Sequence, residues 1–212
     1  MSVAMKVQKP KIPKVLMPFT FEELEDNYIT QSIIEDYSVQ YNDLARFTFN
    51  QVIFRNVVFV EAQFEKVELV DVIFENCDLS NLNMEGANIH RVEFRNSRMV
   101  GTNFSDATFR NVVFENCKLN LAAFGYSDVK QVEFKSCLLN NADFYECAFD
   151  KVVFEYCEIE AANFSGTSLK GVDLSNCQYR QLSASAEHLK GCTVNQEQAI
   201  GFAKMLGLLV KE

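Results

Sequence analysis

The chain has no tryptophan, only two histidines and only three prolines among its 212 residues. It also has no apolar run approaching the roughly 18 residues that a membrane-spanning helix needs, and no secretory hydrophobic segment near its start. These absences argue against a membrane protein and against a secreted one. We therefore expect a soluble, cytoplasmic protein with one main domain, since the length suits a single core.

The motifs that support catalysis are also missing. The sequence contains no phosphate-binding loop, no nucleophile elbow and no cluster of metal ligands. Only His90 and His188 are available as conventional bases, and both are expected to be solvated surface residues. The sequence therefore predicts a protein that is not an enzyme and that uses no cofactor or metal.

Positive charge is scarce. The 20 Lys and Arg residues are outnumbered by 29 Asp and Glu residues, which gives a formal net charge of -9. Affinity for nucleic acids comes largely from cations that neutralise phosphates, so direct binding to nucleic acid is disfavoured. A partner with a basic surface is the expectation instead.

The apolar residues that are present follow one strict period. From Leu44 to Leu174 every fifth residue is apolar, which makes 27 consecutive positions, and a smaller residue commonly stands two positions before each. Valine recurs every twenty residues, at positions 52, 72, 92, 112, 132, 152 and 172. A coil of twenty residues with four five-residue sides explains both periods, because each coil then buries its apolar edge on the next.

This pattern predicts an all-β solenoid of about seven coils over residues 44–180, followed by a short C-terminal α-helix. Asparagine recurs at one corner of the coil, where its tolerance of a left-handed backbone suits a tight turn. These corner residues are Asn56, Asn76, Asn96, Asn116 and Asn176.

The repeat resembles that of the pentapeptide-repeat family, over roughly residues 40 to 180. The family consensus A(D/N)LXX is matched at Ala142-Asp143-Phe144, Ala162-Asn163-Phe164 and Ala87-Asn88-Ile89. The resemblance implies that the solenoid is a right-handed quadrilateral β-helix.

Six of the seven cysteines occupy the small inward position of the repeat, where Ala and Val otherwise stand. They lack the CxxC spacing and the nearby histidines of zinc sites, so we expect them to pack as small hydrophobic residues. Cys192 lies outside the regular repeat and is predicted to be the most reactive thiol. The inward cysteines are Cys77, Cys117, Cys137, Cys147, Cys157 and Cys177.

The two ends of the chain differ from the repeat. Residues 1–18 hold all three prolines and four lysines, a composition typical of a flexible basic tail. Residues 19–43 are predicted to cap the first coil. Residues 181–212 are predicted to form a connector and a helix that begins near Asn195, and the apolar residues of this helix predict a homodimer contact. The residues expected in that contact are Ile200, Phe202, Met205, Leu206 and Leu209.

The C-terminal sequence sharpens the resemblance. Glu197-Gln198-Ala199-Ile200, with Leu206-Gly207-Leu208 after it, is similar to the C-terminus of Qnr-type quinolone-resistance proteins. This implies a bacterial protein that dimerises through its C-terminal end, mimics double-stranded DNA, and protects DNA gyrase and topoisomerase IV from quinolones by binding them. Several members of that group carry loops that interrupt the repeat and are needed for protection. The register here runs from 44 to 174 without an insertion, so the loop-free members are the better models.

A DNA mimic needs its negative charge on one side, because residues 41–180 carry 20 acidic and 13 basic side chains, a net charge of only -7. One side of the coil, formed by residues 60–65 and the equivalent segments up to 160–165, contains acids but no Lys or Arg. We predict that this side and its edge bind the topoisomerase. The acidic residues concerned are Asp43, Glu61, Glu65, Glu85, Asp106, Asp143, Glu146 and Glu160.

Another interpretation stays open. Exposed acids commonly serve only solubility. The chain would then be a repeat scaffold that binds a different protein partner through its basic tail or through an outward apolar column. That column contains Ile53, Ile73, Val113 and Val153.

Overall fold

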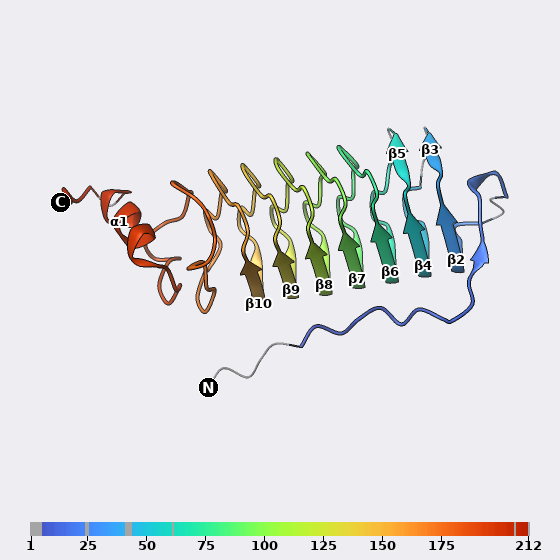
Figure 1. Cartoon of the computed structure of the whole chain (residues 1–212), viewed down its shortest axis with the longest axis horizontal. Coiled ribbons are helices and arrows are strands. Elements are labelled where there is room, and N and C mark those ends of the chain that lie inside the picture. The colour runs from blue at the N-terminus through green and yellow to red at the C-terminus, as the bar shows by residue number, and fades with distance from the viewer. Residues whose placement is uncertain (1–5, 24–25, 41–43, 61, 206, 212) are drawn as a thin grey trace.

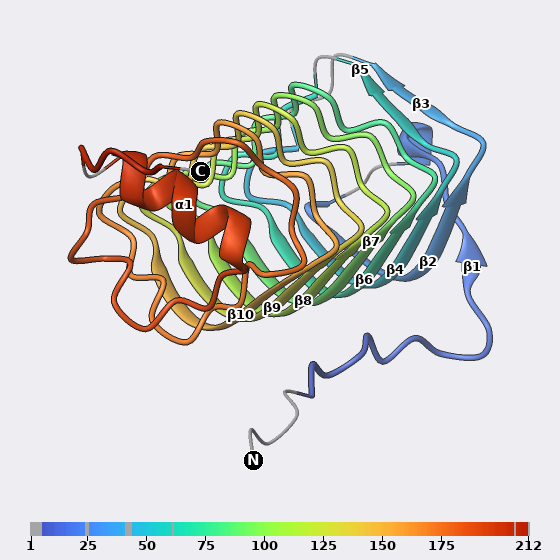
Figure 2. The ribbon, with the colours of Figure 1, turned by 60° about the vertical axis from the view of Figure 1, so that its left-hand side comes forward.

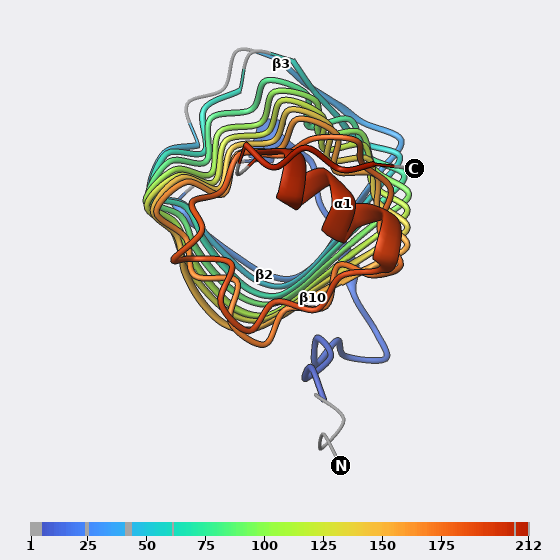
Figure 3. The ribbon, with the colours of Figure 1, turned by 90° about the vertical axis from the view of Figure 1, so that its left-hand side faces the viewer.

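The computed structural model of the protein describes residues 6–23, 26–40, 44–60, 62–205 and 207–211. Its coils stack along one long axis to form a rod (Figure 1). Viewed along that axis, the coil has four sides (Figure 3). The predicted solenoid is confirmed as a parallel β-helix with four-sided coils.

Two sheets run along the rod. The larger has the strand order β1-β2-β4-β6-β7-β8-β9-β10, and the smaller pairs β3 with β5. Neighbouring strands pair in parallel at a register of twenty residues, as in Val52↔Val72. Each strand from β4 onward in the larger sheet has a residue with left-handed backbone near its middle, such as Gln51, so the strand bends across two sides of the coil.

The described elements are β1 Met17–Pro18, a 3-10 helix Phe21–Glu23, β2 Tyr28–Glu35, β3 Ser38–Gln40, β4 Thr48–Arg55, β5 Val58–Val60, β6 Glu68–Glu75, β7 Asn88–Arg95, β8 Thr108–Glu115, β9 Asp128–Lys135, β10 Ala148–Glu155 and α1 Gln196–Met205.

Stacked phenylalanines fill the interior. One column of rings has centroid separations of 4.7, 4.9, 4.8, 4.9 and 5.0 Å. These values match the spacing of adjacent strands, about 4.8 Å, so one residue type in one orientation fits every coil. The column consists of Phe54, Phe74, Phe94, Phe114, Phe134 and Phe154.

Between residues 46 and 171, each described corner of the coil has a residue with positive φ. Four of the five predicted asparagines adopt it, with φ between 50° and 56°, whereas Asn176 is not among these residues. Ser136 and Tyr156 adopt the same conformation at φ 52° and 54°. The stacking of coils therefore imposes the left-handed turn even on residues that do not favour it.

The first coil begins earlier than residue 44. Strand β2 pairs with β4 at the same twenty-residue register, and Ile29, Ile34 and Val39 are buried like the later centres. The part of residues 19–43 from Tyr28 to Gln40 therefore belongs to the β-helix itself. Phe21, whose ring lies 5.8 Å from that of Tyr37, is buried at the end of this first coil.

Residues 6–18 do not behave as the flexible tail that their composition suggests. In Figure 1 they run beneath the strands of the larger sheet, toward its C-terminal end. Strand β1 pairs with β2, and the backbone N–H groups of Gln8 and Lys11 donate hydrogen bonds to side chains of the sheet. Composition alone missed this, because the acceptors lie 60 and 103 residues away in sequence.

Helix α1 closes the other end of the rod (Figure 2). Coil-like bridges continue past residue 180, since Asn163 pairs with Ser183 and Asp173 with Thr193. The predicted start of the helix is confirmed: Asn195 Oδ1 accepts a hydrogen bond from Gln198 N at 2.9 Å.

The side chain of Gln198 joins this helix to the last coil. It is buried, and its Nε2 donates to the carbonyls of Leu174 and Cys177, both at 2.9 Å. The bond to Cys177 satisfies a carbonyl at the end of the stack, and the bond to Leu174 adds a second donor to a carbonyl that also accepts from the N–H of Cys177. Within the described residues, no helix is long and apolar enough to cross a membrane.

Candidate protein-binding surface

The predicted acidic side forms one continuous strip along the rod. Bridges connect its coils in series from Gln63 through Asn83, Asn103, Ala123 and Asp143 to Asn163. Asp43 and Glu61 lie outside the described residues. We call the remaining members the acidic strip: Glu65, Glu85, Asp106, Asp143, Glu146 and Glu160.

Local hydrogen bonds orient several of these carboxylates. Asp143 accepts from Asn163 Nδ2 at 2.8 Å and from the N–H of Tyr145 at 3.1 Å. Glu160 accepts from the N–H of Arg180 at 2.6 Å. Glu85, Asp106 and Glu146 are exposed. The strip therefore combines carboxylates held by local hydrogen bonds with carboxylates that are more exposed to solvent.

Two cations, Arg46 and Lys66, occupy one corner of successive coils at the margin of the strip. Lys66 Nζ is 3.7 Å from a carboxylate oxygen of Glu65. Both side chains are about half exposed, so the pair is weak and screened by salt. It partly offsets the negative charge at the N-terminal end of the strip.

The middle of the strip is apolar, which the sequence analysis did not anticipate. Leu121 and Tyr126 stand at two corners of one coil and are 61% and 58% exposed. Both have left-handed φ, at 61° and 63°, which is unfavourable for bulky side chains. Between them, Ala123 is half-buried and Gly125 is buried. Neither packing nor backbone preference explains an exposed leucine here, so stability does not account for it.

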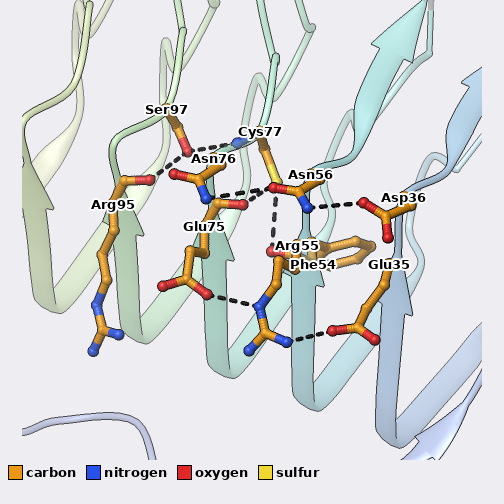
Figure 4. Close-up of polar contacts among 10 residues, drawn as sticks. All are labelled: Glu35, Asp36, Phe54, Arg55, Asn56, Glu75, Asn76, Cys77, Arg95 and Ser97. Carbon is orange, nitrogen blue, oxygen red and sulfur yellow. Dashed lines mark hydrogen bonds and ion pairs between the residues drawn. The ribbon is translucent and has the colours of Figure 1, made fainter.

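A second outward column alternates in charge, and sequence reasoning missed it as well. Arg55 Nε donates to Glu75 Oε2 at 2.8 Å, and its Nη1 pairs with Glu35 on the other side (Figure 4). The column's opposite charges stand directly across from each other in the register of the sheet. We call this the alternating column: Glu35, Arg55, Glu75, Arg95, Glu115, Lys135 and Glu155.

The predicted apolar column is interrupted. Ile53, Ile73, Val113 and Val153 are only half-buried, but acidic residues occupy the same column at positions 93 and 133. The acids at those two positions form ion pairs with Arg95 and Lys135. The column is therefore not a continuous apolar contact surface.

The predicted dimer residues lie at the C-terminal end, where the structure leaves apolar surface exposed. Ile200 is 38% exposed and Leu209 is 96% exposed. Phe202 is half-buried, with its ring 6.2 Å from that of Tyr179. Leu206 and the side chain of Met205 lie outside the described residues. A groove of ≈ 1110 Å³ separates α1 from the neighbouring coils and is lined by Glu160, Tyr179, Ile200 and Phe202 among others.

The two histidines differ in their surroundings. Burial, together with the charge of Arg91, lowers the pKa of His90. Ser185 Oγ lies 2.6 Å from Nδ1 of His188, and a Glu187 oxygen lies 3.8 Å from the same nitrogen. A catalytic relay needs one partner on each ring nitrogen, and these two share one. Among the described residues, no three His, Cys, Asp or Glu side chains are grouped to hold a metal ion.

Six of the seven cysteines are packing residues. The six inward cysteines are buried, and each Sγ lies within hydrogen-bonding distance of a backbone carbonyl, such as that of Phe94 for Cys117. Cys192 is half-buried, and burial followed by the charges of Asp173 and Cys177 raises its pKa to about 11. It is the most accessible of the seven thiols, and its reactivity stays a prediction.

Comparisons with known proteins agree with this architecture. The family model described as a pentapeptide repeat region matches residues 47–124 and 127–201. The uncharacterized protein YisX of Bacillus subtilis (strain 168) is 42% identical over 87 residues, which are 40% of this chain and 41% of that protein. The match thus spans about two-fifths of the length of that curated relative.

Two solved structures of trypsin-treated variants of QnrB1, a plasmid-mediated fluoroquinolone resistance protein, share the fold. The TM-scores are 0.56 and 0.50 at 21% and 20% identity, and the matches cover 88% of this chain and 95% and 94% of those chains. At this level of identity the likeness concerns the fold alone.

Proposed function

Because this chain belongs to the pentapeptide-repeat family, we propose that it is a binding protein that docks on the basic DNA-binding surface of a type II topoisomerase. Proteins of this family are generally structural or interaction proteins rather than enzymes. The C-terminal sequence resembles that of Qnr-type proteins. This resemblance supports DNA gyrase and topoisomerase IV as the partners, and protection from quinolones as the consequence of binding.

The acidic strip is the observation that carries this proposal. It holds carboxylates toward both ends of the rod and Asp106 between them, and residues 60–65 and the equivalent segments contain no Lys or Arg. A surface of one sign attracts a basic partner and speeds association, most strongly at low salt. The alternating column offers no such field, because its charges cancel within a few ångströms.

The apolar centre of the strip would contribute binding energy, whereas the surrounding charges would speed association with the partner. Protein interfaces concentrate their binding energy in a few central apolar or aromatic residues surrounded by a polar rim. Leu121 and Tyr126 have that position relative to the carboxylates. Their exposure makes both side chains accessible to a partner.

The proposal includes a homodimer through α1 and the residues after it. Leu208, Leu209 and Val210 are exposed at 59%, 96% and 41%, next to Ile200. Joining two such ends would double the length of the acidic surface. Leu209→Glu together with Ile200→Glu should give a monomer in sedimentation equilibrium, and a dimer that persists would contradict this contact.

Supercoiling by purified gyrase, with and without a fluoroquinolone, tests the partner. The protein should inhibit supercoiling or rescue it from the drug, and the effect should weaken at higher salt. The variant Glu65→Lys/Glu85→Lys/Asp143→Lys should lose about tenfold or more in potency. Absence of any effect on gyrase or topoisomerase IV at micromolar protein would refute the topoisomerase proposal and leave a scaffold with a different partner.

The matched control is Glu22→Lys/Glu68→Lys/Glu187→Lys, which changes net charge equally at exposed positions away from the strip. Equal loss in both variants would mean that net charge alone matters. Leu121→Asn separates the apolar contribution, because asparagine suits the left-handed backbone and leaves the fold intact. It should lower potency without lowering the unfolding midpoint.

A further inference from the structure

The N-terminal segment, residues 6–18, is held on the outer face of the larger sheet by side chains from one corner of the coil. The N–H of Lys11 donates to Asp71 Oδ1 at 2.9 Å, and Gln51 Nε2 donates to the carbonyl of Lys11 at 3.1 Å. The N–H of Gln8 donates to Asn111 Oδ1 at 3.1 Å. We call this segment the arm, and Gln51, Asp71 and Asn111 the corner hooks.

The spacing of these bonds shows how the arm is built. Between Lys11 and Gln8 the arm advances from the coil of Asp71 to that of Asn111, which is two coils. At about 4.8 Å per coil this is roughly 9.6 Å for three residues, or about 3.2 Å per residue. A polyproline II helix rises about 3.1 Å per residue, and Pro10 lies between the two anchored residues.

The arm runs across the strands rather than along them. Its backbone between Gln8 and Lys11 therefore has no neighbouring strand to pair with, and its N–H groups depend on side-chain acceptors. Every third residue of a polyproline II helix points the same way. The distance between acceptors two coils apart therefore equals the distance between N–H groups three residues apart. Only an extended peptide that lies along the axis of the rod has this spacing.

Asp71 is the central hook. It is only 4% exposed, and Arg91 holds it by two hydrogen bonds of 2.6 and 2.7 Å. Burial alone would raise the pKa of Asp71, but the bonds from Arg91 and from the Lys11 N–H outweigh it and lower the pKa. The ion pair with Arg91 fixes the Asp71 carboxylate next to the arm. The hydrogen bond from the Lys11 N–H to this charged acceptor is stronger than a bond to a neutral one.

The two sides of the arm differ. Val7, Pro10 and Ile12 are half-buried toward the sheet, whereas Lys9 and Lys11 are exposed. The arm contains no acidic residue and four lysines, and Lys11 lies near Asp71. The occupant of this groove is thus an extended, basic chain with half-buried apolar residues.

We propose that the groove along the corner hooks is a peptide-docking site for an extended, basic, proline-containing segment, and that the arm is a built-in occupant which such a segment of a partner protein can displace. Three side-chain hydrogen bonds and a few half-buried residues hold residues 6–12. Segments held this lightly open with far less free energy than the core strands. The proposal does not depend on a topoisomerase being the partner.

The test uses the full chain in two forms. Gln8→Pro/Lys11→Pro removes both N–H donors while keeping the backbone angles of polyproline II, so the arm should leave the groove. A fluorescent synthetic peptide of residues 6–18 should then bind this variant. It should bind the unchanged protein at least about tenfold more weakly, because the attached arm competes at an effective concentration in the millimolar range.

Two controls locate the binding. Val15→Pro adds a proline at a residue that is 76% exposed, and it should behave like the unchanged protein. Adding Asn111→Asp to the double variant keeps an acceptor and should preserve peptide binding, whereas adding Asp71→Asn should weaken it and reduce its salt dependence. Equal peptide binding to the unchanged protein and the double variant, or no binding to either at millimolar peptide, would overturn the proposal.

Discussion

The alternating column and the acidic strip are built by the same coils, yet they treat charge in opposite ways. In the alternating column, each carboxylate faces a cation one coil away, as Glu75 faces Arg55 at 2.8 Å. In the acidic strip, the coils contribute carboxylates, amides and small residues, and Lys66 pairs with Glu65 at its margin. One column neutralises itself along the axis, while the other keeps a net negative charge.

This difference teaches that a solenoid can assign separate tasks to separate columns. Residues twenty positions apart are neighbours, so each outward column is an independent ladder of side chains. Opposite charges across a sheet stabilise it by roughly 0.2–1 kcal/mol per pair. Carboxylates without such partners contribute little to the stability of the fold.

The shared core offers the largest test, because it supports both columns. Phe94 is fully buried between Phe74 and Phe114, with ring separations of 4.9 and 4.8 Å. Phe94→Ala should lower the free energy of unfolding by about 3–5 kcal/mol through lost contacts and a cavity. Urea denaturation followed by circular dichroism measures this, and Phe94→Leu should lose less. A loss below 1 kcal/mol would mean that the coils repack.

The buried ion pair of the arm groove comes next. Asp71→Asn leaves Arg91 without its charged partner while keeping a side chain that tolerates φ 56°. We expect a loss of about 1.5–3 kcal/mol, the usual range for a hydrogen bond to a charged group. The unfolding midpoint should fall, and a variant as stable as the parent would show that solvent replaces the pair.

The same carboxylate predicts a pH dependence. The folded-state pKa of Asp71 lies below its ordinary value of 3.8, so its stabilisation is present above that pH and is lost as pH falls through the folded pKa. The stability difference between the parent and Asp71→Asn should therefore shrink between pH 5 and pH 3. Denaturation curves at both pH values check this, and a constant difference would argue against the assignment.

Reversing one charge in the alternating column should have a smaller effect. Arg55→Glu places three acids in succession and should cost about 1–2 kcal/mol, reduced by the partial exposure of the pair. The neutral change Arg55→Gln should cost less, and 1 M salt should narrow the gap between the two variants. Identical unfolding midpoints for both variants would show that the alternation of charge does not contribute to the free energy of unfolding.

The acidic strip should show the smallest effect on stability. Glu65→Lys/Glu85→Lys/Asp143→Lys changes half-buried and exposed positions, and we expect the free energy of unfolding to change by about 0.5 kcal/mol or less per site. Thermal denaturation measures this in the preparation used for the supercoiling assay. A large destabilisation would assign the strip to the fold rather than to binding.

Much of the fold was predictable because its signal is periodic. The apolar centres after Leu44 and the small inward cysteines were assigned to the interior, and they are buried there. The same period was already present at Ile29, Ile34 and Val39, so the earlier start of the β-helix was a signal that was overlooked. The alternating column was also readable, by comparing residues twenty positions apart.

Other features carried no such signal. The exposure of Leu121 and Tyr126 depends on which residues of a coil lie at corners, and the inward or outward pattern does not distinguish these corners from the rest. The half-buried state of Cys192 depends on an irregular last coil. Lysines and prolines near the start of the chain are typical of disorder. No local pattern shows that distant side chains accept hydrogen bonds from the backbone of this segment.

By itself the sequence determined the coil, its four sides and its buried columns, because a strict period makes every residue's neighbours those twenty positions away. Only the tertiary structure decided how the two ends engage the rod. Lys11 meets Asp71, and Gln198 meets Leu174, through contacts that no repeat relates. Each of these contacts joins a terminal segment to the repeat. The periodic pattern of the repeat does not predict where a segment without that pattern will lie.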